Sequence, residues 1–324
     1  MESRILMTGV GSYLPKRVIT NEELSTFVDT SDEWIKQRTG IEQRHMVADG
    51  EMTSDLAYEA ALQAIENANI SASDIDLIVI ATTTPDDTFP STATKVQHKL
   101  GAKNAFAFDV QAVCAGFVYA LTVAESLMVA QKAKKALVIG AESFTKLLDW
   151  QDRGTCVLFG DGAGAVILES EKAPDEFGIL ASALHSDGSY RDILYVDGGP
   201  SATGDVGHVR MEGQDVFRHA VEKLSSVMDE VLVLADVSAE AVDWLVPHQA
   251  NIRIINGMQR KLGLPSERVV RTVHKHANTS AASIPLALSE AVHDGRIQAG
   301  DLLALEAIGG GLAWGASLVR YGRP

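Results

Sequence analysis

Short, uniformly apolar runs alternate with amphipathic stretches along this chain. Residues 77–86 (LIVIATTTPD) begin with five apolar positions, and residues 136–143 (ALVIGAES) begin with six apolar or glycine positions. This pattern is typical of strands that are buried on both faces of a parallel sheet. Residues 53–69 have apolar side chains at helical spacing, and residues 91–100 predict a further helix. The alternation of strands and helices predicts an α/β fold.

The stretch 105–124 (AFAFDVQAVCAGFVYALTVA) is central to this pattern. It predicts a short strand at 105–108, a tight turn and an apolar helix, with Cys114 where the turn meets the helix. A helix N-terminus has unpaired N–H groups and a partial positive charge, so we expect a lowered thiol pKa and a nucleophilic thiolate. A buried structural cysteine is the alternative, because free cysteine is among the most buried residue types.

The second half of the chain repeats the order of the first. SAEAVDWLVP at 238–247 parallels SASDIDLIVI at 71–80, and in both halves a helix ending in KLG precedes a polar residue at a turn. That residue is Cys114 in the first half and Asn278 in the second. Two copies of one unit predict a pseudo-symmetric α/β protein. Ligands in such folds bind at the carboxyl ends of the strands, so we expect Cys114 and Asn278 to share one site.

The less regular segments give local predictions. Residues 20–50 are polar, with a short helix expected around 31–37. Residues 155–168 (TCVLFGDGAGAVIL) predict a hairpin, in which GDGAG is a turn because it is too short for a phosphate-binding glycine motif. Residues 213–234 predict a long amphipathic helix, and residues 268–273 predict another strand.

Composition excludes several classes of protein. The 324 residues are 46% hydrophobic and 22% charged, which is ordinary for a globular protein. A net charge of −15 argues against nucleic acid as a partner. Two cysteines and no signal-peptide pattern indicate a reducing compartment, so we expect a cytoplasmic location. The apolar window 112–130 contains Glu125, and we interpret it as a core helix with no membrane partner.

A histidine and a run of glycines complete a candidate site. His248 and the glycines 309–311 each follow a buried strand. A lone histidine is more often structural, and glycines can serve only as a bend. Cys114, however, can accept an acyl group as a thioester, with its own N–H and that of Gly310 holding the oxyanion. The side chains of His248 and Asn278 can stabilise a second oxyanion, the enolate of another thioester.

The longer motifs are SDEWIKQRTGI (31–41), CAGF (114–117), DRGTCVLFGDGAGA (152–165), PHQANIRII (247–255), NTSAASIP (278–285) and GGGLAWG (309–315). Through them the chain resembles the β-ketoacyl-acyl-carrier-protein synthase III family, the initiating condensing enzymes of type II fatty-acid synthesis in the thiolase superfamily. The resemblance runs nearly end to end. It implies two thiolase-like halves, residues 1–173 and 174–324, whose duplicated βαβαβαββ units form a five-layer αβαβα sandwich.

The resemblance also implies a two-stage reaction without a metal or organic cofactor. Cys114 takes a short acyl group from acyl-CoA, and malonyl-acyl-carrier protein then binds. His248 and Asn278 stabilise the enolate that forms on loss of CO₂. The carbanion attacks the acyl-cysteine and gives a 3-ketoacyl-carrier protein.

Residues for binding CoA follow from the same resemblance. Trp34 resembles the family residue that stacks on adenine, and Arg153 resembles its partner on the other face. Arg38 resembles a phosphate contact, and Asn251 resembles the contact to the pantetheine arm. A partly buried surface aromatic is the alternative interpretation of Trp34.

The acyl pocket is where this chain departs from the family. Phe89 resembles a residue that crosses a dimer interface to close the pocket, which implies a homodimer. The family commonly has glycine and phenylalanine where this chain has Ala277 and Ile308. Ile308 is expected near Cys114, so the primer is acetyl by default, with a branched or medium-chain acyl group as the alternative.

Acyl-carrier protein is acidic, so its docking surface is expected to be basic. Residues 251–264 contain no acidic side chain. The expected docking residues are Arg218, Arg253, Arg260 and Lys261. A solvated helix face is the alternative.

Four rival functions are considered against this interpretation. One is a related condensing enzyme of secondary metabolism. A biosynthetic thiolase is disfavoured, because the only other cysteine, Cys156, lies far from the C-terminus. A Cys-His-Asn hydrolase would share the residue order of papain-like proteases but lacks their local cysteine signature. A non-catalytic scaffold would need none of these side chains.

Overall fold

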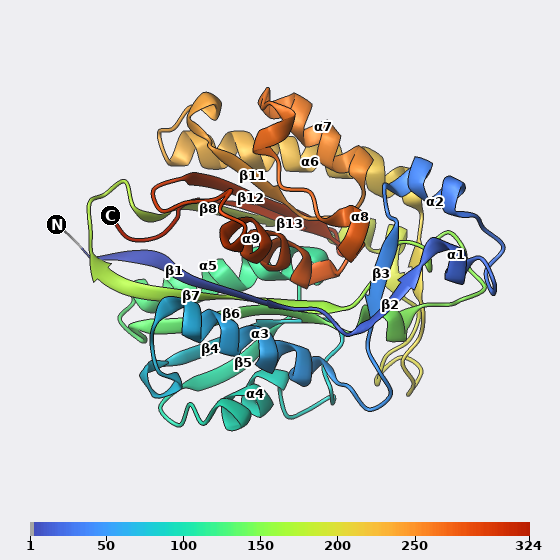
Figure 1. Ribbon diagram of the computed structural model, residues 1–324, viewed down its shortest axis with the longest axis horizontal. Helices are drawn as coiled ribbons and strands as arrows, with labels where there is room; N and C mark the ends of the chain where they lie inside the picture. Colours follow the sequence, from blue (N-terminus) through green and yellow to red (C-terminus); the bar gives the residue numbers. More distant parts are fainter. Residues whose placement is uncertain (1–2) are drawn as a thin grey trace.

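The computed structural model describes residues 3–324 and contains two main β-sheets, which Figure 1 shows one above the other. The first sheet has the order β1-β7-β6-β4-β5. Its strands are β1 (Ser3–Tyr13), β4 (Leu77–Ala81), β5 (Phe106–Val110), β6 (Lys135–Glu142) and β7 (Gly162–Lys172). The second sheet has the order β11-β12-β13-β8. Its strands are β8 (Gly178–Ser186), β11 (Trp244–Pro247), β12 (Leu302–Gly309) and β13 (Ala313–Arg320).

Both sheets follow one strand order, which confirms the predicted duplication. In the first sheet β4 lies parallel to β6, which is followed by antiparallel β7 and β1; in the second, β11, β12, β13 and β8 repeat this arrangement.

The strand predicted at 268–273 is wrong. Val269 makes only an isolated parallel bridge to Leu245. A 3-10 turn (Ser266–Arg268) and helix α8 (Val273–His276) leave no room for a longer strand.

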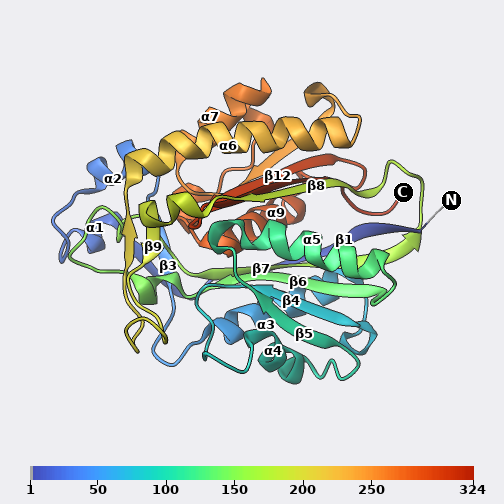
Figure 2. The same ribbon diagram turned by 180° about the vertical axis from the view of Figure 1, so that it is seen from behind.

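Helices complete five layers, as Figures 1 and 2 show from opposite sides. The outer face of the first sheet is covered by α3 (Thr53–Ala68) and α4 (Thr92–Leu100). Between the sheets lie α5 (Gly116–Val129) and α9 (Ser283–His293), and the second sheet is covered by α6 (Gly213–Leu234) and α7 (Ile252–Leu262). Since α5 contacts strands of both sheets, it is apolar nearly all round. The predicted thiolase-like αβαβα sandwich is confirmed.

The smaller elements gather at one end of the molecule (Figure 1). They are β2 (Arg17–Thr20), α1 (Asn21–Leu24), α2 (Asp32–Thr39), β3 (Gln43–Met46), β9 (Leu194–Val196) and β10 (Val209–Met211). The helix expected around 31–37 is α2. Its N-cap is Ser31, whose hydroxyl accepts a hydrogen bond from the N–H of Trp34 at 3.2 Å.

Glycines in the first sheet let α9 and the segment before it pack directly on the strands. A Cβ at Gly140 would lie 2.2 Å from the carbonyl oxygen of Ala281, and a Cβ at Gly164 would lie 2.5 Å from the nitrogen of Leu286. The hairpin predicted at 155–168 is therefore wrong. Its second part is a single strand, β7, paired with β1 on one side and β6 on the other. The glycines there permit a close helix approach and do not form a hairpin turn.

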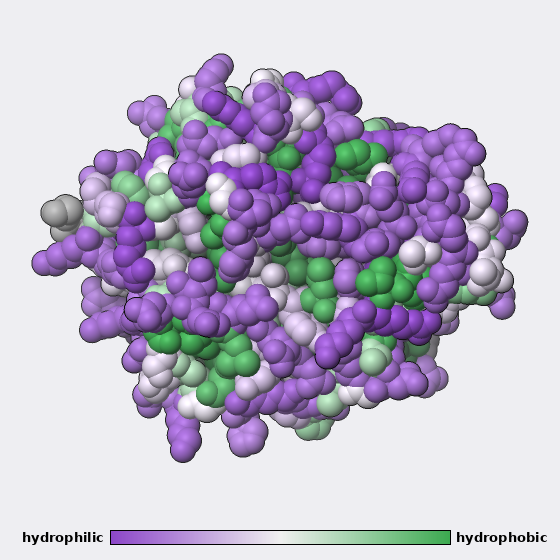
Figure 3. Space-filling view, viewed as in Figure 1, coloured by the Kyte–Doolittle hydropathy of each residue, from purple (hydrophilic) through white to green (hydrophobic). Residues whose placement is uncertain are grey.

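The surface seen in Figure 3 is mostly hydrophilic, with separate small apolar patches. Among residues 3–324, no helix is both long and apolar enough to cross a bilayer. The apolar window 112–130 is mostly the central helix α5, as predicted.

Candidate active site

Cys114 lies in the 3-10 turn Val113–Ala115, directly before α5, where the sequence predicts it. The preceding residue, Val113, has a φ of 49°, a left-handed conformation that is uncommon for a β-branched residue. Only 4% of Cys114 is exposed. The turn therefore holds the thiol inside the protein at the N-terminus of the central helix.

The expectation of a lowered thiol pKa is wrong. Burial raises the pKa of Cys114 to about 12. The nearby buried carboxyl of Glu142 acts in the same direction, whereas the Ser280 hydroxyl beside the thiol opposes it. Loss of hydration outweighs the other influences, so Cys114 is a neutral thiol in the unliganded protein. Its proton has to leave when the sulfur becomes acylated.

The segment 278–283 connects the candidate catalytic residues. Ser280 lies beside Cys114, and its backbone N–H donates to Oδ1 of Asn278 at 2.9 Å. Further along, Oγ of Ser283 lies 2.6 Å from Nδ1 of His248. Asn278 is the first residue of this segment, and Cys114 and His248 both lie beside it. The segment therefore brings together three residues that are far apart in the sequence.

The side chain of Asn278 has a fixed orientation. Because its Oδ1 accepts from the N–H of Ser280, its amide NH₂ points the other way as a donor. The backbone N–H of Asn278 donates to Leu158 at 3.0 Å, and its carbonyl accepts from Gly160 at 3.0 Å. Just before it, Ala277 has φ 59° and ψ −161°, which glycine adopts at lower cost.

His248 follows the end of β11, and its backbone N–H donates to the carbonyl of Glu306 at 2.8 Å. It is 4% exposed, and burial lowers its pKa to about 3, so the ring is neutral at physiological pH. The Glu306 side chain is also buried, which raises its pKa to about 8. Sequence reasoning missed Glu306, although a lone acidic residue in the apolar strand LLALEAIG was a signal.

The glycine run lies against the Cys114 turn. A Cβ on Gly309 would lie 2.6 Å from the backbone nitrogen of Cys114. Ile308, just before it, is buried at the end of β12, and this strand packs against the Cys114 turn. A cleft of about 1380 Å³ opens beside the turn and is lined by Val113 and Gly310, among others. This cleft is large enough for a sizeable substrate.

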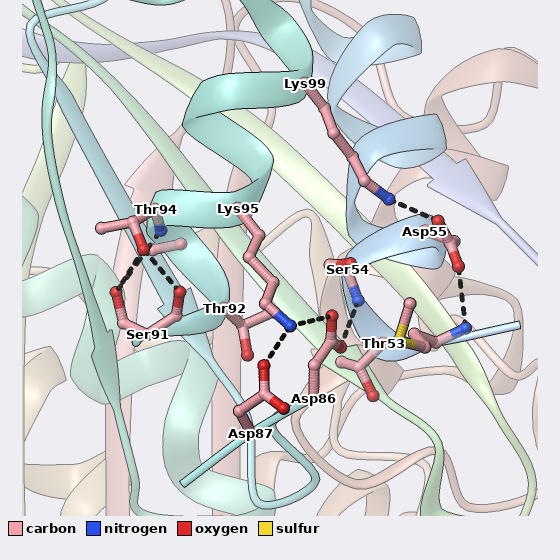
Figure 4. Close-up of polar contacts among 12 residues, drawn as sticks. Thr53, Ser54, Asp55, Asp86, Asp87, Ser91, Thr92, Thr94, Lys95 and Lys99 are labelled. Carbon is pink, nitrogen blue, oxygen red and sulfur yellow. Dashed lines mark hydrogen bonds and ion pairs between the residues drawn. The ribbon is translucent and has the colours of Figure 1, made fainter. Parts of the chain in front are cut away.

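The loop between β4 and α4 forms one wall of the cleft. Asp86 accepts a hydrogen bond from the N–H of Ser54 at 2.9 Å and pairs with Lys95 at 3.4 Å, and Lys95 also contacts Asp87 (Figure 4). Phe89, on the same loop, has 83% of its surface exposed and does not line the cleft of its own chain.

Three predicted CoA-binding residues lie together. The guanidinium carbon of Arg38 lies 4.7 Å from the centre of the Trp34 ring, and that of Arg153 lies 5.3 Å from it. Arg153 also donates to the carbonyl of Asp29 at 3.0 Å. An aromatic ring with two cationic groups over it suits an adenine ring and its phosphates.

Asn251 has a structural role in this structure. It is the N-cap of α7, and its Oδ1 accepts from the N–H groups of Arg253 and Ile254 at 3.0 and 3.1 Å. Its amide NH₂ makes no hydrogen bond within residues 3–324, so that group is available to a ligand.

The predicted docking residues lie on α6 and α7, and acidic neighbours neutralise part of their positive charge. Arg218 pairs with Asp215 at 2.9 Å, and Lys261 pairs with Asp229 at 3.2 Å. The guanidinium of Arg253 donates to the carbonyl of Gln37 on α2 at 3.3 Å. The fourth residue, Arg260, is exposed and forms no ion pair or side-chain hydrogen bond with any residue the structure describes. The patch is therefore less positive than the sequence predicts.

The fold and the chemistry of this site define a class, the thiolase-fold condensing enzymes. Two family models match the chain: 3-oxoacyl-[acyl-carrier-protein] synthase III over residues 108–188, and the C-terminal part of the same family over residues 232–321. The chain belongs to the 3-oxoacyl-[acyl-carrier-protein] synthase III family. It is an acyltransferase, a condensing enzyme of fatty-acid synthesis, as the sequence predicts.

Individual relatives span the whole chain. It is 60% identical to beta-ketoacyl-[acyl-carrier-protein] synthase III of Paramagnetospirillum magneticum, covering 98% of this chain and 99% of the relative. The crystal structure of 3-oxoacyl-[acyl-carrier-protein] synthase III from Aquifex aeolicus has 47% identity and a TM-score of 0.92, with 98% and 100% of the chains covered. The priming β-ketosynthase of the R1128 polyketide pathway has 33% identity and a TM-score of 0.93, with 100% and 98% covered.

Proposed function

We propose that this enzyme transfers a short acyl group from acyl-CoA to Cys114 and condenses it with malonyl-acyl-carrier protein. The gathering of Cys114, His248 and Asn278 around the segment 278–283 is the observation that carries the proposal. A hydrolase or a scaffold would not need a second pair of oxyanion donors beside the nucleophile.

In the first stage the sulfur of Cys114 attacks the thioester carbonyl of acyl-CoA. The N–H groups of Cys114 and Gly310 hold the tetrahedral oxyanion, and the bond to the CoA sulfur then breaks. The thiol proton passes to the departing sulfur. CoA therefore leaves as a thiol. Because burial raises the pKa of the Cys114 thiol to about 12, above that of an ordinary thiol, its proton leaves only as the new carbon–sulfur bond forms.

In the second stage the malonyl carboxylate leaves as CO₂, and its bonding electrons form an enolate. The amide NH₂ of Asn278 and the ring of His248 donate hydrogen bonds to the enolate oxygen. The carbanion attacks the acyl-Cys114 carbonyl, a carbon–carbon bond forms, and the carbon–sulfur bond breaks. The thiolate then takes a proton from water. Since decarboxylation creates the carbanion, neither a strong base nor a cofactor is required.

CoA binds in this proposal at the end of the molecule that carries α2. Trp34 stacks on the adenine, with Arg153 on its other face, and Arg38 contacts a phosphate. Asn251 donates its free amide NH₂ to the pantetheine arm. The two guanidinium groups already over Trp34 support this assignment.

The enzyme works as a cytoplasmic homodimer in this proposal. Strand β5 is at the edge of the first sheet, and Phe106 on it is 43% exposed. Natural proteins rarely leave such an edge uncovered. The exposed Phe89 then enters the acyl pocket of the second copy, where Ile308 is the other determinant. Acyl-carrier protein docks on the α6–α7 surface.

Acetyl is the default primer, and a branched or medium-chain group is the alternative. The relatives near 60% identity carry the synthase III name, whereas the polyketide priming enzyme is only 33% identical, which favours fatty-acid synthesis over secondary metabolism.

The experiment is intact-mass measurement after mixing the protein with acetyl-, isobutyryl-, hexanoyl- or octanoyl-CoA, with Cys114→Ala as the control. One acyl adduct, absent in the variant, is expected, and the most efficient acyl group identifies the primer. Malonyl-acyl-carrier protein should then remove the adduct and yield a 3-ketoacyl product. Release of free acid without malonyl-acyl-carrier protein would instead indicate a hydrolase.

A further inference from the structure

The ring of His248 has one strong contact that the sequence motifs do not explain. Its Nδ1 lies 2.6 Å from the hydroxyl oxygen of Ser283, the first residue of α9. The other ring nitrogen, Nε2, makes no hydrogen bond within residues 3–324. A neutral imidazole carries a proton on only one nitrogen. If Nδ1 accepts a hydrogen bond from the Ser283 hydroxyl, Nε2 carries the proton and is a donor. If Nδ1 donates to Ser283, Nε2 is an acceptor.

The hydroxyl of Ser283 has a second partner that fixes this direction. The backbone N–H of Gln249 donates to the same oxygen at 3.2 Å. If His248 also donated to it, the hydroxyl proton would need a third partner, and the structure shows none within the described residues. Ser283 is buried, so bulk water does not supply one. If Ser283 donates to Nδ1 instead, every polar group in the contact is satisfied.

Gln249 holds this arrangement rigidly. Its side-chain nitrogen donates to the carbonyls of Pro247 and Val270 at 2.8 and 3.1 Å. Its side-chain oxygen accepts from the N–H groups of Thr272 and Val273 at 2.8 and 3.1 Å. All the hydrogen-bonding capacity of this buried side chain is thus used to fix the backbone beside His248.

We propose that Ser283 is a positioning residue that holds His248 in the tautomer with the proton on Nε2. The proposal rests on the function proposed above. It makes His248 a hydrogen-bond donor to the enolate oxygen in the condensation stage and prevents it from acting as a base through Nε2. Loading of Cys114 then does not depend on the tautomer, whereas condensation does.

The test combines the tautomer with the two stages of the reaction. ¹⁵N chemical shifts of the histidine rings distinguish protonated from unprotonated nitrogens, and a His248→Gln variant assigns the signals. In the unaltered enzyme Nε2 of His248 should carry the proton. In Ser283→Ala both tautomers should be populated, and turnover with malonyl-acyl-carrier protein should fall roughly 10- to 100-fold. Loading of Cys114 by acyl-CoA should change less than about twofold.

Ser289→Ala is the matched control. Ser289 is also buried on α9, but its hydroxyl contacts Ser12 and His293, remote in the sequence from the His248 contact. This variant should keep both rates. A proton on Nδ1 in the unaltered enzyme would overturn the inference, even if Ser283→Ala did not fold. Equal loss of loading and condensation in a folded Ser283→Ala would also overturn it. Absence of condensation in the unaltered enzyme would instead refute the proposed function.

Discussion

Gly309 packs so closely against the backbone of Cys114 that no larger residue fits at position 309. A Cβ on Gly309 would be 2.6 Å from the backbone nitrogen of Cys114 and 3.1 Å from the Val113 side chain. We therefore expect Gly309→Ala to displace the N–H proposed for the oxyanion site. Acyl loading of Cys114 should fall at least about 100-fold, with stability reduced by roughly 1–3 kcal/mol. Intact mass over time and urea unfolding measure the two effects.

The control for this variant is Gly213→Ala. Gly213 is the first residue of α6, and an added Cβ there meets only the end of Met211 at 3.5 Å. Loading should remain unchanged. If Gly309→Ala loaded acyl groups as fast as this control, the glycine would have no part in oxyanion stabilisation.

The buried thiol predicts a particular pH dependence of alkylation. Because the pKa of Cys114 is raised to about 12, its thiolate fraction should grow tenfold for each pH unit throughout the accessible range. The rate of Cys114 modification by iodoacetamide should therefore rise steadily from pH 6.5 to 9.5, with free cysteine as the reference reaction. A plateau above pH 8 would show that the thiol has an ordinary or lowered pKa.

The buried carboxyl of Glu306 predicts a loss of stability as the pH rises from about 4.5 to 8. Burial raises its pKa to about 8, so the folded chain keeps a proton that the unfolded chain releases above pH about 4.5. Its contribution is complete below that pH and is lost as the pH rises through 8. Glu306→Gln cannot lose a proton. From pH 4.5 to 9, its unfolding free energy should improve relative to the unaltered protein by roughly 3–5 kcal/mol.

Urea unfolding at several pH values measures this difference, with the exposed Glu66→Gln on α3 as the control. A constant difference between Glu306→Gln and the unaltered protein across this pH range would mean that Glu306 is ionised in the folded state.

The order of the elements follows from hydrophobic periodicity, because buried parallel strands and amphipathic helices have distinct patterns. The position of Cys114 at the start of α5 follows in the same way. Its pKa does not, since the burial and the neighbours that set it, Glu142 and Ser280, come from distant parts of the chain. The role of the glycines at 162 and 164 is similarly ambiguous in the sequence, because glycine serves both in hairpin turns and at close contacts between elements. Only the packing of α9 on β7 shows that they permit close approach within a strand.

The role proposed for Ser283 in the active site also could not be predicted from the sequence. In the sequence it is one of several small residues in NTSAASIP and has no distinguishing feature. Its importance comes from two hydrogen bonds, one to His248 and one from Gln249, both more than thirty positions away. A contact of this kind is fixed by tertiary packing, which periodicity does not reveal.

The cluster of Trp34, Arg38 and Arg153 predicts that removing its aromatic ring lowers the affinity for CoA. Trp34→Ala removes the ring on which the adenine is proposed to stack, and stacking of a base on an aromatic ring contributes about 1–3 kcal/mol. The KM for acyl-CoA should rise roughly 10- to 100-fold. The same acyl group on N-acetylcysteamine, which has no adenine, should load at an unchanged rate. Equal losses with both donors would assign Trp34 a structural role only.

The docking surface is best tested at Arg260. Arg253→Glu would give an ambiguous result, because Arg253 also bonds to Gln37 on the helix that carries Trp34. Arg260 makes no such contact within the described residues, so Arg260→Glu should act through charge alone. At low salt the KM for malonyl-acyl-carrier protein should rise roughly five- to tenfold, and the effect should shrink as salt screens the charges. Loading by acyl-CoA should not change.

Lys132→Glu provides the matched control, since it changes the net charge equally but lies beyond the far end of α5. If both variants raised this KM by the same factor, the −15 charge of the whole protein would explain the effect without a docking surface. A change confined to Arg260→Glu would place the acidic partner on α7. That position lies on the same helix as Asn251, whose free amide NH₂ is proposed to contact the pantetheine arm.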